Sequence, residues 1–152
     1  MPSGQTTDNS ADKTEANKAL IRKAMGSLGH NDMRPLIDAL DDHVVWISHS
    51  PASHIRWGGE HTDRGGALGL LAKLSSVFSF RKFEVDRIAA IGDEVWAICD
   101  FEAFHPPTGR TVTGRNVLCA TVKNGKLTSY EGFFDTLSVL LQLGIEMPQP
   151  PR

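Results

Sequence analysis

Three side chains in this 152-residue chain have the chemistry of a small-molecule site: His49, Asn116 and Tyr130. An imidazole titrates near neutral pH and can act as a general base. An amide and a phenol can hydrogen-bond to an oxygen on which charge develops. We therefore expect a catalytic group in which Asn116 and Tyr130 polarise a ligand oxygen and His49 moves the proton.

Each of the three also has an explanation that needs no ligand. A buried amide costs free energy unless it is paired, so Asn116 is equally explained as a structural amide bonded to backbone at a bulge. Tyr130 can fill the core with its hydroxyl pointing to the mouth of a cavity. His49 can be a solvated loop histidine. Which explanation holds depends on the face of the strand from which each side chain projects.

The most informative stretch is residues 126–135, which follows the hairpin signal Asn124-Gly125. We predict that it pairs antiparallel with residues 110–122. Strand alternation then puts Tyr130 and Gly132 on one face, and the same alternation applies to the strands 43–48 and 94–105. These inward faces supply the expected apolar ligand-binding residues, which are Val45, Ile47, Cys99, Phe101, Leu118 and Phe134.

The segment 49–65 is expected to be a loop over the mouth of the cavity. His49 continues the parity of Val45 and Ile47, which aims it inward. Trp57 is either a lid over the cavity or an anchor for the loop. The histidines of this loop have irregular spacing that matches no zinc motif such as H-E-x-x-H, so we expect no metal site. Nothing in the sequence indicates a cofactor.

The whole pattern predicts an α+β fold. Apolar residues at helical spacing indicate helices at 12–28, 33–40 and 67–77, and a short helix at 137–143 capped by Asp135 or Thr136. The order of helices, strand, helix and antiparallel meander favours a strongly bent antiparallel sheet wrapped around the N-terminal helices. We expect a cone with an apolar cavity at 12–145, a flexible leader at 1–11 and a tail at 146–152.

The cavity itself is predicted from small residues on the inward faces. Gly132 lies between Tyr130 and Phe134 and gives up packing that a closed core would use. We therefore expect room for a guest molecule that would bury mostly carbon and meet a few polar groups.

Composition narrows the partners. The net charge of −2 predicts neither a nucleic-acid partner nor a basic membrane patch. No stretch approaches the roughly 18 apolar residues of a transmembrane helix. Two cysteines without a secretion signal favour a reducing compartment, which we expect to be the cytoplasm. Cys99 and Cys119 have opposite parity on neighbouring strands, so we expect no disulfide between them.

The outward faces predict a homodimer. Several apolar residues point outward together, which is too much apolar surface to leave in water. They are Trp96, Ile98, Phe104, Val117 and Phe133. The charged residues between them favour cross-strand ion pairs over paired-carboxylate catalysis, because their parity is also outward. These are Asp100, Glu102, Arg115 and Glu131.

The chain resembles a known family in two stretches, D-D-H-V-V-W after two helices and Y-E-G-F-F-D-T at the last strand. Both are similar to the SnoaL-like family of the nuclear transport factor 2-like superfamily, and the resemblance covers roughly residues 16–143. It implies a conical α+β fold. Members include ketosteroid isomerases, epoxide hydrolases, polyketide cyclases and non-catalytic binders, so the fold alone does not define an activity.

Two activities can be tested against this resemblance. The catalytic positions of ketosteroid isomerases fall near Ala24, Ile47 and Leu118, none of which can move a proton. The stretches P-P-T-G-R, N-G-K and F-F-D look like limonene epoxide hydrolase, whose Arg and two Asp fall at Cys99, Phe101 and Gly132. We therefore reject both activities for this chain.

Three functions remain open. The first is an enzyme with isomerase-, cyclase- or hydratase-type proton transfer on a small hydrophobic molecule, with a cyclic molecule among the candidates. The second is a non-catalytic binder of such a molecule. The third is a dimeric adaptor that uses the outer sheet face. A titratable group inside the cone would favour the enzyme, and only His49 qualifies.

Overall fold

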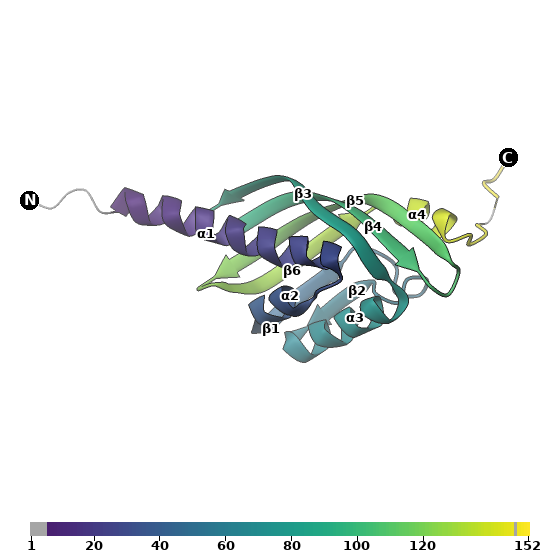
Figure 1. Cartoon of the computed structure of the whole chain (residues 1–152), viewed down its shortest axis with the longest axis horizontal. Helices are drawn as coiled ribbons and strands as arrows, with labels where there is room; N and C mark the ends of the chain where they lie inside the picture. The colour runs from purple at the N-terminus through teal and green to yellow at the C-terminus, as the bar shows by residue number, and fades with distance from the viewer. Residues whose placement is uncertain (1–5, 148) are drawn as a thin grey trace, which may run out of the picture.

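The structure is a computed structural model that describes residues 6–147 and 149–152. Figure 1 shows the helices and strands in chain order. They are α1 (Thr6–Gly26), the short 3₁₀ helix η1 (Ser27–His30), α2 (Arg34–Ala39), β1 (Leu40–Ser48), β2 (Gly59–Thr62), α3 (Asp63–Val77), β3 (Ser79–Ile91), β4 (Glu94–His105), β5 (Arg110–Lys123), β6 (Lys126–Phe134) and α4 (Thr136–Gln142).

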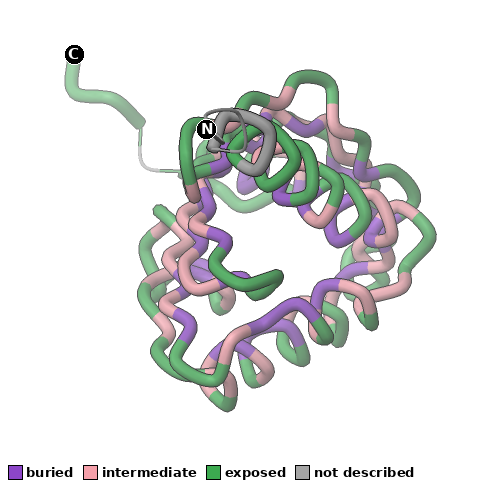
Figure 2. Tube along the Cα trace, turned by 90° about the vertical axis from the view of Figure 1, so that its left-hand side faces the viewer, coloured by how far each residue is buried: buried purple, intermediate pink, exposed green. Residues whose placement is uncertain are grey.

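The strands form one six-stranded sheet in the order β2-β1-β6-β5-β4-β3. Four of the pairings are antiparallel, while β1 runs parallel to β6. Helix α1 packs against β3 and α3 packs against β1, so the helices and the bent sheet enclose the core between them (Figure 2). The predicted α+β cone is confirmed, with the parallel β1–β6 pair as the one departure from an antiparallel sheet.

The predicted parity is correct for the last three strands. Along β4, Val95, Ala97 and Cys99 are all buried while Trp96 is exposed. Along β5 and β6, the buried positions likewise alternate with half-buried or exposed ones. The two thiols fit this pattern, because Cys99 is buried inside, Cys119 is half-buried outside and both are free. The opposite parity from which no disulfide was expected is therefore confirmed.

The predicted parity is wrong for β1. Within its segment V-V-W-I, the buried residues are Val44 and Trp46, while Val45 and Ile47 are only half-buried. The pairing with β6 explains the difference, since Trp46 lies in register with the inward Tyr130 and Ile47 lies in register with Glu131. Both parities of V-V-W-I are apolar, so hydrophobic alternation could not distinguish them.

Two elements extend beyond their predicted bounds. Helix α1 begins at Thr6, so residues 6–11 are helical where a leader was expected, and residues 1–5 lie outside the described residues. The expected loop 49–65 contains β2, which pairs with β1, and the first turn of α3. Asp63 Oδ1 accepts a hydrogen bond from Gly66 N at 2.8 Å, which supports that turn despite two weakly helical glycines.

Helix α4 closes one end of the sheet. Asp135 caps it by accepting a hydrogen bond from Ser138 N at 3.0 Å. Its Gln142 side chain accepts from Thr113 N at 2.8 Å and donates to Thr113 O at 2.9 Å. The amide thus takes the place of a strand partner where β6 has ended. Across the described residues, no helix is long and apolar enough to cross a membrane.

Candidate functional site

An apolar cavity of about 110 Å³ lies between the concave face of the sheet and the helices. Most of its wall is carbon, contributed by α1, η1, α3 and the four strands β3 to β6, with β1 at one side. The lining residues are Met25, Leu28, Trp46, Ser48, Trp57, Leu70, Leu74, Phe78, Phe80, Phe83, Phe101, Ala103, Val112, Asn116, Tyr130, Gly132, Phe134 and Val139.

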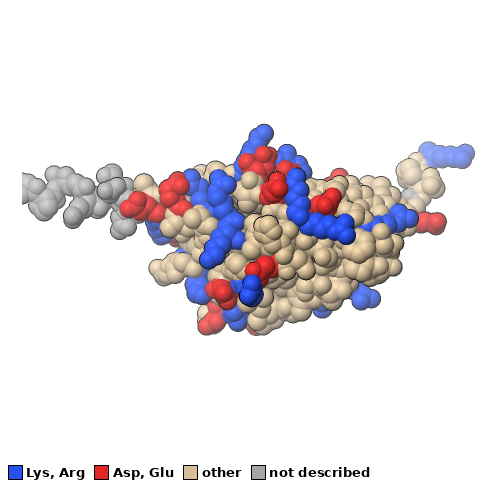
Figure 3. Space-filling view, in the orientation of Figure 1, with Lys and Arg blue, Asp and Glu red and all other residues tan. Residues whose placement is uncertain are grey.

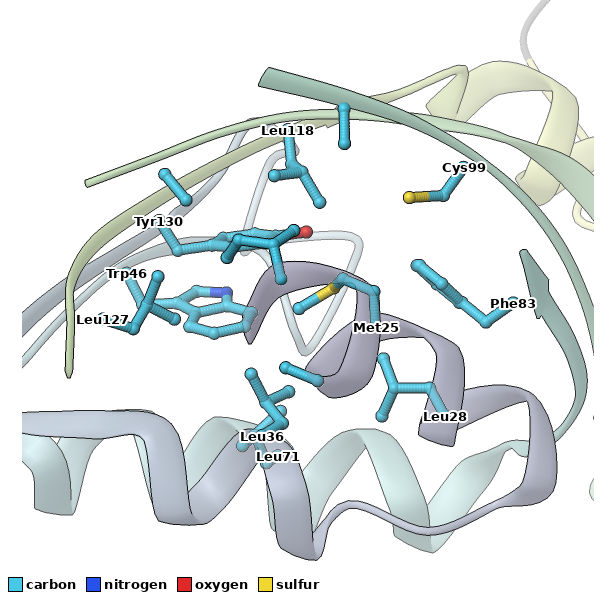
Figure 4. Close-up of a cluster of buried hydrophobic side chains, with 14 of the residues drawn as sticks. Met25, Leu28, Leu36, Trp46, Leu71, Phe83, Cys99, Leu118, Leu127 and Tyr130 are labelled. Carbon is cyan, nitrogen blue, oxygen red and sulfur yellow. The ribbon is translucent and has the colours of Figure 1, made fainter. Parts of the chain in front are cut away.

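The polar centre of this wall is a hydrogen-bonded pair, in which Asn116 Nδ2 donates to Tyr130 Oη at 3.0 Å. Both side chains are buried, and both come from strands whose alternation aims them inward. The Tyr130 ring stacks on Trp46, as the close-up in Figure 4 shows, and the two ring centroids are 3.8 Å apart. Burial raises the pKa of Tyr130 well above its ordinary value, so the phenol is neutral at physiological pH.

The inward glycines make room for aromatic rings of the protein itself. A Cβ at Gly132 would lie 2.8 Å from a carbon of the Tyr130 ring, and one at Gly114 would lie 2.7 Å from Phe101 Cζ. Gly114 is the direct cross-strand partner of Phe101. The rings of Phe101 and Tyr130 can therefore lie flat on the sheet. Gly132 was expected to leave space for a guest, but the Tyr130 ring occupies the position beside it. A cavity nevertheless remains, and Gly132 forms part of its wall.

Several predicted site residues do meet at the cavity. Asn116, Tyr130, Phe101, Phe134 and Trp57 all line it. Trp57 lies over Phe78 in an edge-on contact with ring centroids 5.0 Å apart, which places it at the wall rather than free in a loop.

Two predicted ligand-binding residues lie in the core behind the wall. Cys99 and Leu118 are fully buried but do not line the cavity. Burial raises the pKa of the Cys99 thiol to about 12, so it stays protonated and unreactive. Both residues pack the core and offer no surface to a ligand.

The structure places His49, Val45 and Ile47 on the opposite side of the sheet. His49 Nε2 lies 2.6 Å from Glu131 Oε1, and the imidazole stacks on Phe133 at 4.1 Å. This follows from the register of β1 with β6, which places Val45, Ile47 and His49 on the outer face of the sheet. The predicted inward orientation of His49 is therefore wrong, and Val45 and Ile47 share the error.

Sequence reasoning missed Trp46 and Ser48, which occupy the inward positions of β1. The large side chain of Trp46 could have indicated this orientation. Trp46 and Val44 lie on the same face of the strand, and a large aromatic residue beside a valine favours burying that face. It also missed the aromatic residues of β3, because a register shift between Phe80 and Lys82 returns Phe83 to the inner face. A bulge of this kind breaks simple alternation.

Charge is confined to the outside of the described cone. None of the lining residues carries a charge at neutral pH. On the outer face, Arg115 contacts both Asp86 and Asp100, with Arg115 Nε 2.9 Å from Asp100 Oδ1. Acidic and basic side chains are intermixed on the surface that Figure 3 presents. The predicted outward placement of the charged strand residues is correct.

A wider groove of about 580 Å³ lies between α1, α2 and the β5–β6 turn. Its wall includes Lys23, Asp32, Arg34 and Asp38, and the exposed Arg34 is already paired with Asp32 at 2.9 Å. That pairing lowers the pKa of Asp32 to about 2. We prefer the smaller cavity as the candidate site, because it is apolar and contains a buried polar pair.

The comparison with known families decides the family. The SnoaL-like domain matches residues 21–130. The chain belongs to the SnoaL-like family. The resemblance drawn from the two sequence stretches is thus confirmed. No curated protein matches the sequence of this SnoaL-like chain.

Solved structures agree on the fold. A nuclear transport factor 2-like protein of unknown function from Burkholderia pseudomallei is 18% identical, with a TM-score of 0.74 over 84% of this chain and 97% of that one. TerC, crystallised with polyporic acid, is 22% identical, with a TM-score of 0.74 over 85% and 98%. An LEH-like epoxide hydrolase of M. tuberculosis is 18% identical, with a TM-score of 0.70 over 86% and 91%. At these identities the likeness shows the shared fold alone.

Proposed function

We propose that this SnoaL-like protein binds a small hydrophobic molecule in the cone, with its one polar group beside Asn116 and Tyr130. The observation that supports this most is a carbon-lined cavity with a buried, hydrogen-bonded polar pair in its wall. Small-molecule sites have this composition, in which carbon provides the contact and a few polar groups orient the ligand.

The size of the cavity limits the ligand. A volume of about 110 Å³ is somewhat below the roughly 150 Å³ of an engineered apolar cavity that binds benzene. It is also well below the roughly 300–1,000 Å³ of pockets for drug-sized ligands. The proposed ligand, or the part of it that enters, is therefore about one ring in size, and the flat Trp46–Tyr130 stack suits a ring.

The geometry favours binding over proton transfer. His49, which was the proposed base, is hydrogen-bonded to Glu131 on the outer face, with Nε2 2.6 Å from Oε1. The phenol of Tyr130 stays neutral because burial raises its pKa. Among the described lining residues, no carboxylate or imidazole faces the cavity. We therefore favour the non-catalytic binder over isomerase-, cyclase- or hydratase-type chemistry.

The test is a titration with benzene that is monitored by the NMR signal of ¹³Cζ in labelled tyrosine. Tyr130 is the only tyrosine in the chain, so the signal reports on this site alone. We expect a saturable shift. Ala103→Leu should abolish it, since Ala103 lines the cavity and the larger side chain would fill about one ring's worth of space. The matched control is Ala89→Leu on exposed β3 surface, which should bind as the wild type does. Absence of saturable binding to the wild type would refute the proposal.

We also propose a homodimer through the outer sheet face. Three apolar side chains there are well exposed, with Trp96 at 44%, Phe133 at 41% and Val117 at 36%. They lie on adjacent strands of one continuous surface, bordered by the ion pairs of Arg115. Apolar groups surrounded by charges are typical of a self-complementary contact between two copies.

A further inference from the structure

The donors and acceptors of the Asn116–Tyr130 pair define the chemistry of the ligand's polar group. Asn116 Nδ2 donates to Tyr130 Oη, so the hydroxyl proton of Tyr130 must point elsewhere. Among the hydrogen bonds of the described residues, none uses this hydroxyl as a donor or Asn116 Oδ1 as an acceptor. Both residues line the cavity. The pair therefore presents at least one free donor and one free acceptor to a guest.

This count does not depend on how the amide is oriented. If the oxygen and nitrogen of Asn116 exchanged places, Tyr130 would donate to Oδ1 and the amide N–H groups would face the cavity. The phenol oxygen would then supply the acceptor. In either orientation, at least one donor and one acceptor remain for a ligand.

The surrounding wall determines the charge of the group. No Lys, Arg, His, Asp or Glu side chain is among the described lining residues. An ionised group would lose its hydration there without gaining a counter-charge, which is strongly unfavourable. Tyr130 cannot act as an anion itself, because its buried phenol stays protonated. The ligand's polar group must therefore be neutral.

We propose that the cavity selects a ring bearing a neutral hydroxyl group, as in a phenol or a cyclic alcohol. A hydroxyl both accepts a hydrogen bond and donates one, so it satisfies both partners at once. A ketone or an ether would use the donor alone and leave the acceptor unpaired, which is costly once water is displaced. This inference rests on the proposed function, since it specifies the ligand of the same cavity.

The experiment compares phenol, benzene and benzoate as probes at neutral pH, using the same tyrosine signal and calorimetry. We expect phenol to bind about tenfold more tightly than benzene, which is the effect of one well-made buried hydrogen bond. Benzoate should not bind. Phenol binding should disappear as pH rises above about 10, where phenol itself ionises.

The double variant Tyr130→Phe/Asn116→Leu removes the polar pair while keeping the shape of the wall. Replacing both partners by apolar groups leaves neither unpaired, so the fold should be retained. We expect it to favour phenol over benzene less than about twofold. Calorimetry measures this, because the variant contains no tyrosine. Trp96→Phe, on the outer face, is the control and should retain the full preference.

The outcomes separate this inference from the proposed function. Equal binding of phenol and benzene by the wild type would overturn the inference and leave an apolar binding site. Tight binding of benzoate would overturn it in favour of an anion site. If neither benzene nor phenol binds, both the inference and the proposed function fail.

Discussion

The two faces of one sheet use the same kind of contact for different purposes. Between β1 and β6, the inner face stacks Trp46 on Tyr130 with centroids 3.8 Å apart, and the outer face stacks His49 on Phe133 with centroids 4.1 Å apart. The inner stack is completed by the neutral hydrogen bond from Asn116. The outer stack is completed by the hydrogen bond between His49 and Glu131.

The difference shows that solvent access decides what a stacked pair can do. Inside, the described cavity wall offers no counter-charge, so its polar atoms are neutral and each one matters to a ligand. Outside, water and ions screen the His49–Glu131 pair, so the pair contributes little energy. Chemistry that depends on a charged group would have to take place outside the cone, whereas the ligand-sized space lies inside it.

The largest effect is expected for Trp96→Glu on the outer face. A charge at the centre of the proposed dimer contact should weaken dimerisation by more than about 100-fold, or about 3 kcal/mol, as at a binding hot spot. Light scattering across a concentration series measures this. Leu141→Glu, on the exposed side of α4, is the control and should leave the dimer intact. A wild type that is already monomeric at micromolar concentration would contradict the proposed dimer.

Gly114→Val on the inner face should be the next largest effect. Its side chain would displace the Phe101 ring, whose Cζ already lies 2.7 Å from the position of a Cβ. We expect a loss of about 1–3 kcal/mol in the free energy of unfolding. Thr113→Val, the exposed neighbour on the same strand, should change it by less than about 0.5 kcal/mol. Denaturant unfolding compares the two, and equal effects would contradict the close packing of Phe101 over Gly114.

High pH should weaken the inner face through Tyr130. Its folded-state pKa is raised above the unfolded value of about 10, so the stability it contributes is complete below pH 10 and is lost as pH rises further. The free energy of unfolding should fall by up to about 1.4 kcal/mol per pH unit there. Tyrosinate absorbance reports ionisation of this single phenol, and Tyr130→Phe should remove its share of the fall. If the Tyr130 phenol titrated near its ordinary pKa of about 10, the phenol would be exposed to solvent, which would contradict its burial.

The smallest effect is expected for His49→Ala. The imidazole is half exposed and makes one hydrogen bond at the solvent-exposed surface and one stack, so the free energy of unfolding should fall by less than about 1 kcal/mol. Benzene binding should not change, because His49 does not line the cavity. Thermal unfolding and the tyrosine signal measure the two properties. A large loss of benzene binding would contradict the placement of His49 outside the cavity.

Hydrophobic alternation was enough to predict much of the sheet and to place four of the predicted site residues at the cavity wall. On β5, Arg115 and Leu118 belong to sets of clearly different polarity, so only one face could be buried. The Asn124-Gly125 turn defined the register with β6, since Lys123 pairs with Lys126 across it. Asn116, Tyr130, Phe101 and Phe134 were placed correctly for this reason.

Contacts between distant parts of the chain decided the rest. On β1 both alternate sets are apolar, so only the parallel pairing with β6, more than eighty residues later, put Trp46 inside and His49 outside. Gly132 was expected to leave space for a ligand, but the ring of Tyr130 lies where a Cβ on Gly132 would be. A local pattern specifies a face when its two sides differ in polarity; when they do not, the energy of tertiary packing makes the choice.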